Sequence, residues 1–134
     1  MDNFFEYKNV RLFKPNSLEF QNAVGNKYSD EDFKTHGILL RKKLNAELIL
    51  ITRGGDNSLL FTEDRNQYIS TESSGVHDVS GAGDTVISIF ALADLCGATP
   101  NDAANLANFA AGIVCSQVGV VPITTKDLLK SLKY

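Results

Sequence analysis

The residues best suited to chemistry lie in one short segment, His77-Asp78-Val79-Ser80-Gly81-Ala82-Gly83-Asp84, which leads directly into an apolar run. Two glycines let a backbone turn tightly, and a helix that begins behind them directs unpaired N–H groups and a positive dipole end at a ligand. The amides of Gly81, Ala82, Gly83 and Asp84 are therefore a candidate anion hole. A carboxylate beside a bound phosphate is repelled by it, so we expect such a carboxylate to have a chemical role. Asp84 can be the general base that takes a proton from an attacking hydroxyl. The segment predicts phosphoryl transfer to an alcohol.

These residues also have structural interpretations. Asp84 by itself reads more simply as a first-turn acid stabilised by the helix dipole. His36 and His77 have no partners at ligand spacing, so both are expected to be structural. Cys96 and Cys115 form no Cys-x-x-Cys pair, which argues against zinc and against a disulfide scaffold and predicts two buried thiols.

Composition narrows the class of protein. The chain has 134 residues, 43% of them hydrophobic, and a formal net charge of −3, so it has no basic footprint for nucleic acid. No uncharged apolar run reaches membrane-spanning length, and the first residues are acidic and polar where a signal peptide would be basic and then apolar. We expect a cytoplasmic protein without nucleic-acid or membrane partners.

Strands and helices are expected to alternate in the first half of the chain. A short strand over 10–13 stops at Pro15, and Asn16 caps a helix that runs from Ser17 to about Val24. A capping box at Ser29 opens a second helix, and an apolar strand over 47–52 is typical of a buried parallel sheet. Strands over 58–61 and 67–71 would form a hairpin around 63–66.

The second half is expected to be helical. Residues 84–95 are apolar nearly all round, as in a buried helix behind an active site, and Gly97 ends this helix. Thr99 and Pro100 start another helix, and a small last helix begins at Thr124 or Thr125. The apolar face of the helix after Thr99 is expected to carry Leu106, Phe109, Ala110 and Ile113. Alternating strands and helices indicate a layered α/β fold.

The segment 78–84 resembles the signature of the ribokinase-like (PfkB) family of sugar and nucleoside kinases, roughly Asp-Thr-x-Gly-Ala-Gly-Asp, with Val79 in place of the usual Thr. Three further stretches resemble family elements in the expected order. Residues 13–20 resemble an Asn-x-x-Glu element, residues 52–58 a Thr-x-Gly-x-x-Gly turn with Asn57 for the last Gly, and residues 107–114 with Gly119 the helix and loop over the adenine. Because Asn tolerates left-handed backbone angles, we expect the turn at Asn57 to persist.

The resemblance implies a fold and an extent. It implies that residues 1–134 are the C-terminal, ATP-binding part of a PfkB-type kinase domain, with a mostly parallel sheet, a β-hairpin and helices on both faces. Kinases of this family are about twice as long, so the substrate-binding and lid part is expected to be missing. An isolated part would expose core and strand edges, which predicts self-association.

The resemblance also implies site roles, with ATP and Mg²⁺ as cofactors. Asn16 and Glu19 would hold magnesium and the phosphates, Thr52 and Gly54 would line the nucleotide, and Asn108 would contact adenine. Asp78 would order its loop or assist a monovalent cation such as K⁺. In the structural alternatives, Glu19 is a first-turn acid beside its cap, Thr52 and Gly54 simply end a strand, and Asn108 is a satisfied polar residue.

Within the family, residues 78–87 and 106–114 look most like the heptose-7-phosphate kinase domain of ADP-heptose synthases. The resemblance therefore implies ATP-dependent phosphorylation of a sugar or sugar-phosphate hydroxyl. Two alternatives stay open: another sugar kinase of the ribokinase or fructokinase kind, and a nucleotide-binding or assembly module without turnover. A Rossmann dehydrogenase is disfavoured because the Gly-x-Gly-x-x-Gly fingerprint is absent.

Overall fold

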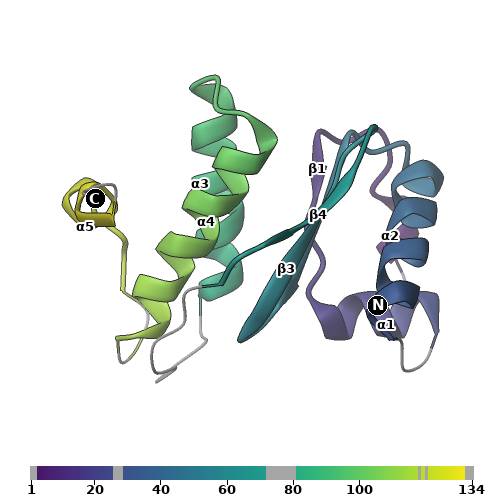
Figure 1. Cartoon of the computed structure of the whole chain (residues 1–134), viewed down its shortest axis with the longest axis horizontal. Helices are drawn as coiled ribbons and strands as arrows, with labels where there is room; N and C mark the ends of the chain where they lie inside the picture. The colour runs from purple at the N-terminus through teal and green to yellow at the C-terminus, as the bar shows by residue number, and fades with distance from the viewer. Residues whose placement is uncertain (1–2, 26–28, 72–80, 118, 120, 132–134) are drawn as a thin grey trace. The chain divides into compact units, whose positions relative to one another are not determined.

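The computed structural model describes residues 3–25, 29–71, 81–117, 119 and 121–131, and the chain divides into two compact units, Met1–Tyr68 and Ile69–Tyr134. In the first unit a short 3₁₀ helix η1 (Phe4–Glu6) precedes the elements β1 (Leu12–Phe13), α1 (Ser17–Val24), α2 (Asp30–Leu44), β2 (Leu48–Arg53) and β3 (Asp56–Phe61). The last strand, β4 (Asn66–Ile69), also begins in the first unit, and its final residue, Ile69, is the first of the second unit. The second unit contains α3 (Ala82–Leu95), α4 (Pro100–Cys115) and α5 (Thr125–Ser131) (Figure 1).

The sheet of the first unit is mixed, with strand order β1-β2-β3-β4. β1 pairs in parallel with β2, with Leu12 opposite Leu48, and β3 runs antiparallel to β2, with Phe61 opposite Ile49. The parallel pair is joined through α1 and α2, which lie on the same side of the sheet (Figure 1). The expected order of strands and helices is confirmed.

The helix α2 lies very close to the sheet. Its buried face carries Phe33, Gly37, Leu40 and Leu44. A Cβ added at Gly37 would lie 2.3 Å from Cζ of Phe61, so this helix position has no room for a side chain. Phe33 also stacks on Phe20 of α1, with ring centroids 5.3 Å apart. This packing closes the core of the first unit.

The predicted helix caps are present. Asn16 caps α1, Ser29 and Asp32 form a reciprocal capping box at α2, and Thr99 accepts a hydrogen bond from the N–H of Asp102 at α4. The helix α3 ends as expected at Gly97, which has a φ of 87°, and the N–H of Ala98 bonds back to the carbonyl of Ala93 over 3.0 Å. This is the Schellman arrangement that favours glycine.

The structure corrects three expectations about burial. The helix α3 is not covered all round, because Leu92 is 60% exposed and Leu95 84% exposed. Cys96 is exposed rather than buried. The buried side of α4 consists mainly of small residues, whereas Leu106, Phe109 and Ile113 are half-buried. Those buried residues are Ala103, Ala104, Ala107, Asn108, Ala110 and Val114.

The hairpins also differ in detail. β3 begins at Asp56 instead of Ser58, so Arg53 and Asp56 pair across a two-residue connection, Gly54-Gly55. β4 begins at Asn66, a residue expected in the turn before it. Alternation of polar and apolar side chains is a weak signal for the start of this strand because Asp56 and Asn57 are both polar and exposed.

In the described part of the chain, no helix is long and apolar enough to span a bilayer.

Candidate functional site

Asn16 and Thr52 meet where the parallel strands β1 and β2 end. The N–H of Thr52 donates to the carbonyl of Pro15 over 3.1 Å, and Asn16 and Thr52 form a parallel bridge beyond the ladder. Ligands of open α/β sheets bind outside the carboxyl ends of their strands. The structure therefore brings two residues predicted to bind the nucleotide to the edge where a ligand is expected.

Glu19 lies one helical turn from this bridge. Its Oε2 accepts a hydrogen bond from the N–H of Asn16 over 2.8 Å, and its own N–H donates to Oδ1 of Asn16 over 2.8 Å. These bonds agree with the structural interpretation of both residues as a helix cap, and they leave Oε1 of Glu19 without a hydrogen bond to the described residues. A coordination shell made of one carboxylate oxygen, water molecules and phosphate oxygens fits Mg²⁺, which seldom loses its full hydration shell.

The predicted nucleotide turn is tighter than the family pattern suggested. Gly54 has a φ of 62°, and a Cβ there would meet no atom within 4 Å, so Gly54 faces open space. Asn57 lies in β3 and does not have a positive φ, so the expectation that Asn57 takes a left-handed turn position was wrong. The left-handed residue is Gly54, and the antiparallel pairing of β2 with β3 decides this.

The start of α3 has the form expected of an anion site. Gly81 is the N-cap with a φ of 79°, and it has no side chain with which to cap the first amides, those of Ala82, Gly83 and Asp84. The N–H and Oγ1 of Thr85 both bond to the carbonyl of Gly81, over 2.9 and 3.0 Å, which fixes the first turn. Asp84 is exposed in this turn and makes no hydrogen bond or ion pair within the described residues.

Asn108 is held inside the second unit. Its side chain is 4% exposed, and Nδ2 donates to the carbonyls of Ile69 and Ser70 over 3.4 and 3.3 Å. This geometry supports the interpretation of Asn108 as a satisfied polar residue, and its contact with adenine stays a prediction. Asp78 and His77 lie outside the described residues, and the residues that are described contain no group of three or more metal-ligating side chains.

Arg53 is a residue that the motifs did not single out. Its Nη2 lies 2.8 Å from Oδ1 of Asp30, although it stands between Thr52 and Gly54 in the chain. The sequence did contain a signal for Arg53, because a positively charged residue lies inside 52–58, a stretch expected to line the nucleotide.

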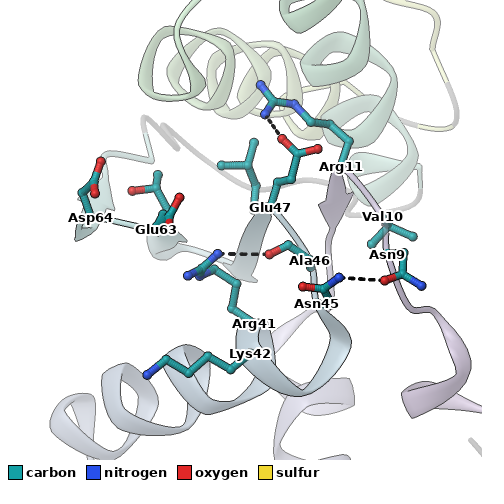
Figure 2. Close-up of a pocket in the computed structure, with 12 residues that line it drawn as sticks. Asn9, Val10, Arg11, Arg41, Lys42, Asn45, Ala46, Glu47, Glu63 and Asp64 are labelled. Atoms are coloured by element: carbon teal, nitrogen blue, oxygen red, sulfur yellow. Dashed lines mark hydrogen bonds and ion pairs between the residues drawn. The ribbon is translucent and has the colours of Figure 1, made fainter.

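A polar hollow of about 720 Å³ lies at the start of β2, the end opposite to the Gly54-Gly55 turn. Its side chains pair with one another: Nη1 of Arg11 lies 2.6 Å from Oε2 of Glu47, and Nδ2 of Asn45 donates to Oδ1 of Asn9 over 2.7 Å (Figure 2). Arg41 donates to the carbonyl of Ala46. None of the predicted site residues lines this hollow.

Comparison with known proteins identifies the family of the chain. A model described as pfkB family carbohydrate kinase matches residues 7–126. The chain belongs to this family. The family resemblance inferred from the motifs is therefore confirmed.

Relatives of this pfkB family chain include the bifunctional protein HldE of Histophilus somni, 38% identical over 126 residues, which cover 93% of this chain and 26% of that protein. The HldE protein of Psychromonas ingrahamii is 34% identical over 130 residues, which cover 96% of this chain and 27% of that protein. The chain thus spans about 27% of the length of these curated relatives.

Solved structures show the same ribokinase-like fold. Arabidopsis thaliana ribokinase complexed with ribose and ATP matches with a TM-score of 0.85 and 25% identity, over 96% of this chain and 42% of that one. Phosphofructokinase-2 of Escherichia coli in complex with potassium matches with a TM-score of 0.85 and 16% identity, over 94% of this chain and 41% of that one. The predicted layered α/β fold is confirmed.

Proposed function

We propose that the chain is the nucleotide-binding part of an ATP-dependent kinase that phosphorylates a sugar or sugar-phosphate hydroxyl. The observation that carries the proposal is the start of α3, where uncapped amides and the exposed carboxylate of Asp84 lie in one helical turn. Phosphoryl transfer depends mainly on positioning and on stabilising charge on the transferring oxygens, and this turn offers both kinds of group.

The amides of Gly81, Ala82, Gly83 and Asp84 would bind the transferring phosphoryl group. Removal of one preorganised donor from such a hole typically costs about 3 kcal/mol of transition-state stabilisation. Asp84 would accept the proton of the acceptor hydroxyl. Asp84 makes no hydrogen bond to the described residues, so its carboxylate oxygens are open to an acceptor hydroxyl.

Asn16, Glu19, Thr52 and Gly54 would bind the nucleotide at the ends of β1 and β2. When Mg²⁺ is bound with ATP, it neutralises phosphate charge, and the open Oε1 of Glu19 would hold it through water. Asp78 would order the loop before Gly81, with a monovalent cation such as K⁺ as a further cofactor. These roles follow the family pattern residue by residue.

The acceptor is proposed to be heptose 7-phosphate. The amino-acid sequence of residues 78–87 and 106–114 supports this acceptor, as do relatives that carry the name HldE. Ribose or fructose is the alternative acceptor, since Arabidopsis ribokinase, crystallised with ribose and ATP, has the same fold.

Nucleotide binding without turnover is the second candidate function. The chain covers 42% of the length of the ribokinase that it resembles, and a base without an acceptor pocket has no hydroxyl to deprotonate. Calorimetry with a non-hydrolysable ATP analogue and magnesium tests the nucleotide binding that the two candidates share, and turnover distinguishes them. Both require binding, and both require its loss in Gly83→Val, whose side chain would fill the anion hole.

Turnover is tested in a protein that carries the whole kinase domain around these residues. We expect Asp84→Asn to lower kcat by about 10²- to 10⁴-fold on heptose 7-phosphate, because the variant cannot accept the proton. The matched control is Asp64→Asn, an exposed acid of the loop between β3 and β4. A kcat for Asp84→Asn equal to that of the control would show that Asp84 is not the base, and faster turnover of ribose or fructose would replace the heptose assignment.

A further inference from the structure

Arg53 lies between two carboxylates beside the Gly54-Gly55 turn. Its Nη2 is 2.8 Å from Oδ1 of Asp30 and 4.0 Å from Oδ2 of Asp56. The guanidinium carbon lies 5.2 Å from the centre of the Phe33 ring, and the Arg53 side chain is only 16% exposed. Arg53 is thus fixed on the core of the first unit with its charge directed at both acids.

The two acids come from different elements and are themselves solvent-facing. Asp30 is the first residue of α2, with a side chain 59% exposed, and it also accepts a hydrogen bond from Oη of Tyr68 over 3.3 Å. Asp56 pairs with Arg53 across the turn, with a side chain 78% exposed. Two negative charges therefore stand at the turn that is proposed to line a nucleotide, and Arg53 contacts both.

We propose that Arg53 is a positioning residue that neutralises Asp30 and Asp56, so that the turn accepts the phosphates of a nucleotide. The inference rests on the proposed function, because Thr52 and Gly54 on either side of Arg53 are the proposed nucleotide contacts. An arginine whose planar head already lies over an aromatic ring loses little freedom when it pairs with a carboxylate.

The physical reason is Coulombic. A carboxylate and a phosphate at a partly exposed site repel each other over several ångströms, and the repulsion is screened by salt. With Arg53 present the three side chains carry a net charge of −1, and without it they carry −2. Adenosine has no phosphates, so its binding responds to the shape of the turn but not to this charge.

The test is calorimetric titration of the full 134-residue chain with ATP–Mg²⁺ and, separately, with adenosine. We expect Arg53→Met to weaken ATP binding about three- to tenfold at low salt and to leave adenosine binding unchanged. We expect Arg53→Met with Asp30→Asn to recover most of the ATP affinity, because one of the exposed charges is gone. Arg53→Lys should stay near the wild type, and Arg65→Met, in the exposed loop between β3 and β4, is the matched control.

Three outcomes would overturn the inference. Equal losses for ATP and adenosine would mean that Arg53 only supports the shape of the turn, and unchanged ATP binding in Arg53→Met would remove its role. If Arg53→Met does not fold by circular dichroism, Asp30→Asn alone decides, since it should then strengthen ATP binding at low salt. A wild-type chain that binds neither ligand would refute the proposed nucleotide function itself, and this inference with it.

Discussion

Asn16 and Glu19 show how one pair of residues can satisfy a structural and a functional interpretation at once. Their reciprocal hydrogen bonds, both 2.8 Å, cap α1 and fix the two side chains. A metal-binding carboxylate benefits from such fixing, because a ligand held in place loses less freedom on binding. The capping bonds therefore do not compete with the proposed magnesium role, since they use only one oxygen of Glu19.

Gly37 is the residue at which packing leaves the least freedom. We expect Gly37→Ala to lower the free energy of unfolding by about 1 to 2 kcal/mol, because the added methyl meets the buried Phe61 ring and this overpacking outweighs the gain in helix propensity. Urea unfolding followed by circular dichroism measures it.

Two further variants make the Gly37 result specific. Phe61→Leu in the Gly37→Ala background should cost less than Phe61→Leu alone, because the smaller side chain makes room for the methyl. Thr35→Ala, at an exposed position of the same helix, should change the stability by less than about 0.5 kcal/mol. A Gly37→Ala variant more stable than the wild type would contradict the close approach of α2 to β3.

At the scale of elements, α2 is stabilised at both ends by groups that its own sequence supplies. Ser29 and Asp32 cap its first turn, which carries three acids including Asp32, and its last turn carries three basic residues. Asn45 ends the helix in the left-handed conformation. Such a helix complements its dipole at each end.

The cap of α2 predicts a dependence of stability on pH. Hydrogen bonds from Oγ and then from the N–H of Ser29 hold the pKa of Asp32 below its ordinary value of 3.8. A lowered pKa in the folded state adds stability that is fully present above pH 3.8 and is lost as the pH falls through the folded-state pKa. Unfolding midpoints of the wild type and Asp32→Asn, compared from about pH 6 down to about pH 2.5, should therefore converge at the acid end.

The control for Asp32 is Glu31→Gln, in the same turn but outside the capping box. The difference in unfolding midpoint between Glu31→Gln and the wild type should change much less with pH. A constant gap between the wild type and Asp32→Asn across the pH range would mean that the charge of Asp32 is irrelevant to the cap.

At the scale of the whole molecule, the exposed apolar side chains of α3 are the feature that needs explaining. Leu92 and Leu95 are highly exposed on a helix whose sequence is apolar nearly all round. Helices of this composition are normally covered. The chain spans 42% of the length of Arabidopsis ribokinase, and the rest of a kinase domain is one candidate to cover such a face.

For the isolated chain we expect self-association through this face. Light scattering should give an apparent mass above that of one chain, 14.6 kDa, and Leu92→Lys with Leu95→Lys should lower it, because charges resist burial. Leu18→Lys is the matched control, since Leu18 is 64% exposed on α1. A monomeric wild type at high concentration would rule out the expected association.

The sequence by itself determined the elements whose signals are local. Caps at Asn16, Ser29 and Thr99 and the periodic face of α2 placed three helices correctly, because each signal acts within one or two turns. The Gly81–Asp84 motif likewise located an uncapped helix start with an exposed acid. Family membership followed from four such stretches in order.

The tertiary structure decided what depends on distant partners. Strand pairing moved the start of β3 to Asp56 and made Gly54 the left-handed residue, and no local pattern records which strand a polar stretch will pair with. Packing buries mainly small residues of α4 and leaves its larger ones half-buried, and Leu95 of α3 stays exposed. The Arg53 ion pair joins residues 23 positions apart, a contact that only the folded chain creates. Burial and charge pairing are set by the whole chain, so the motifs predict candidate site residues but not the surroundings of those residues.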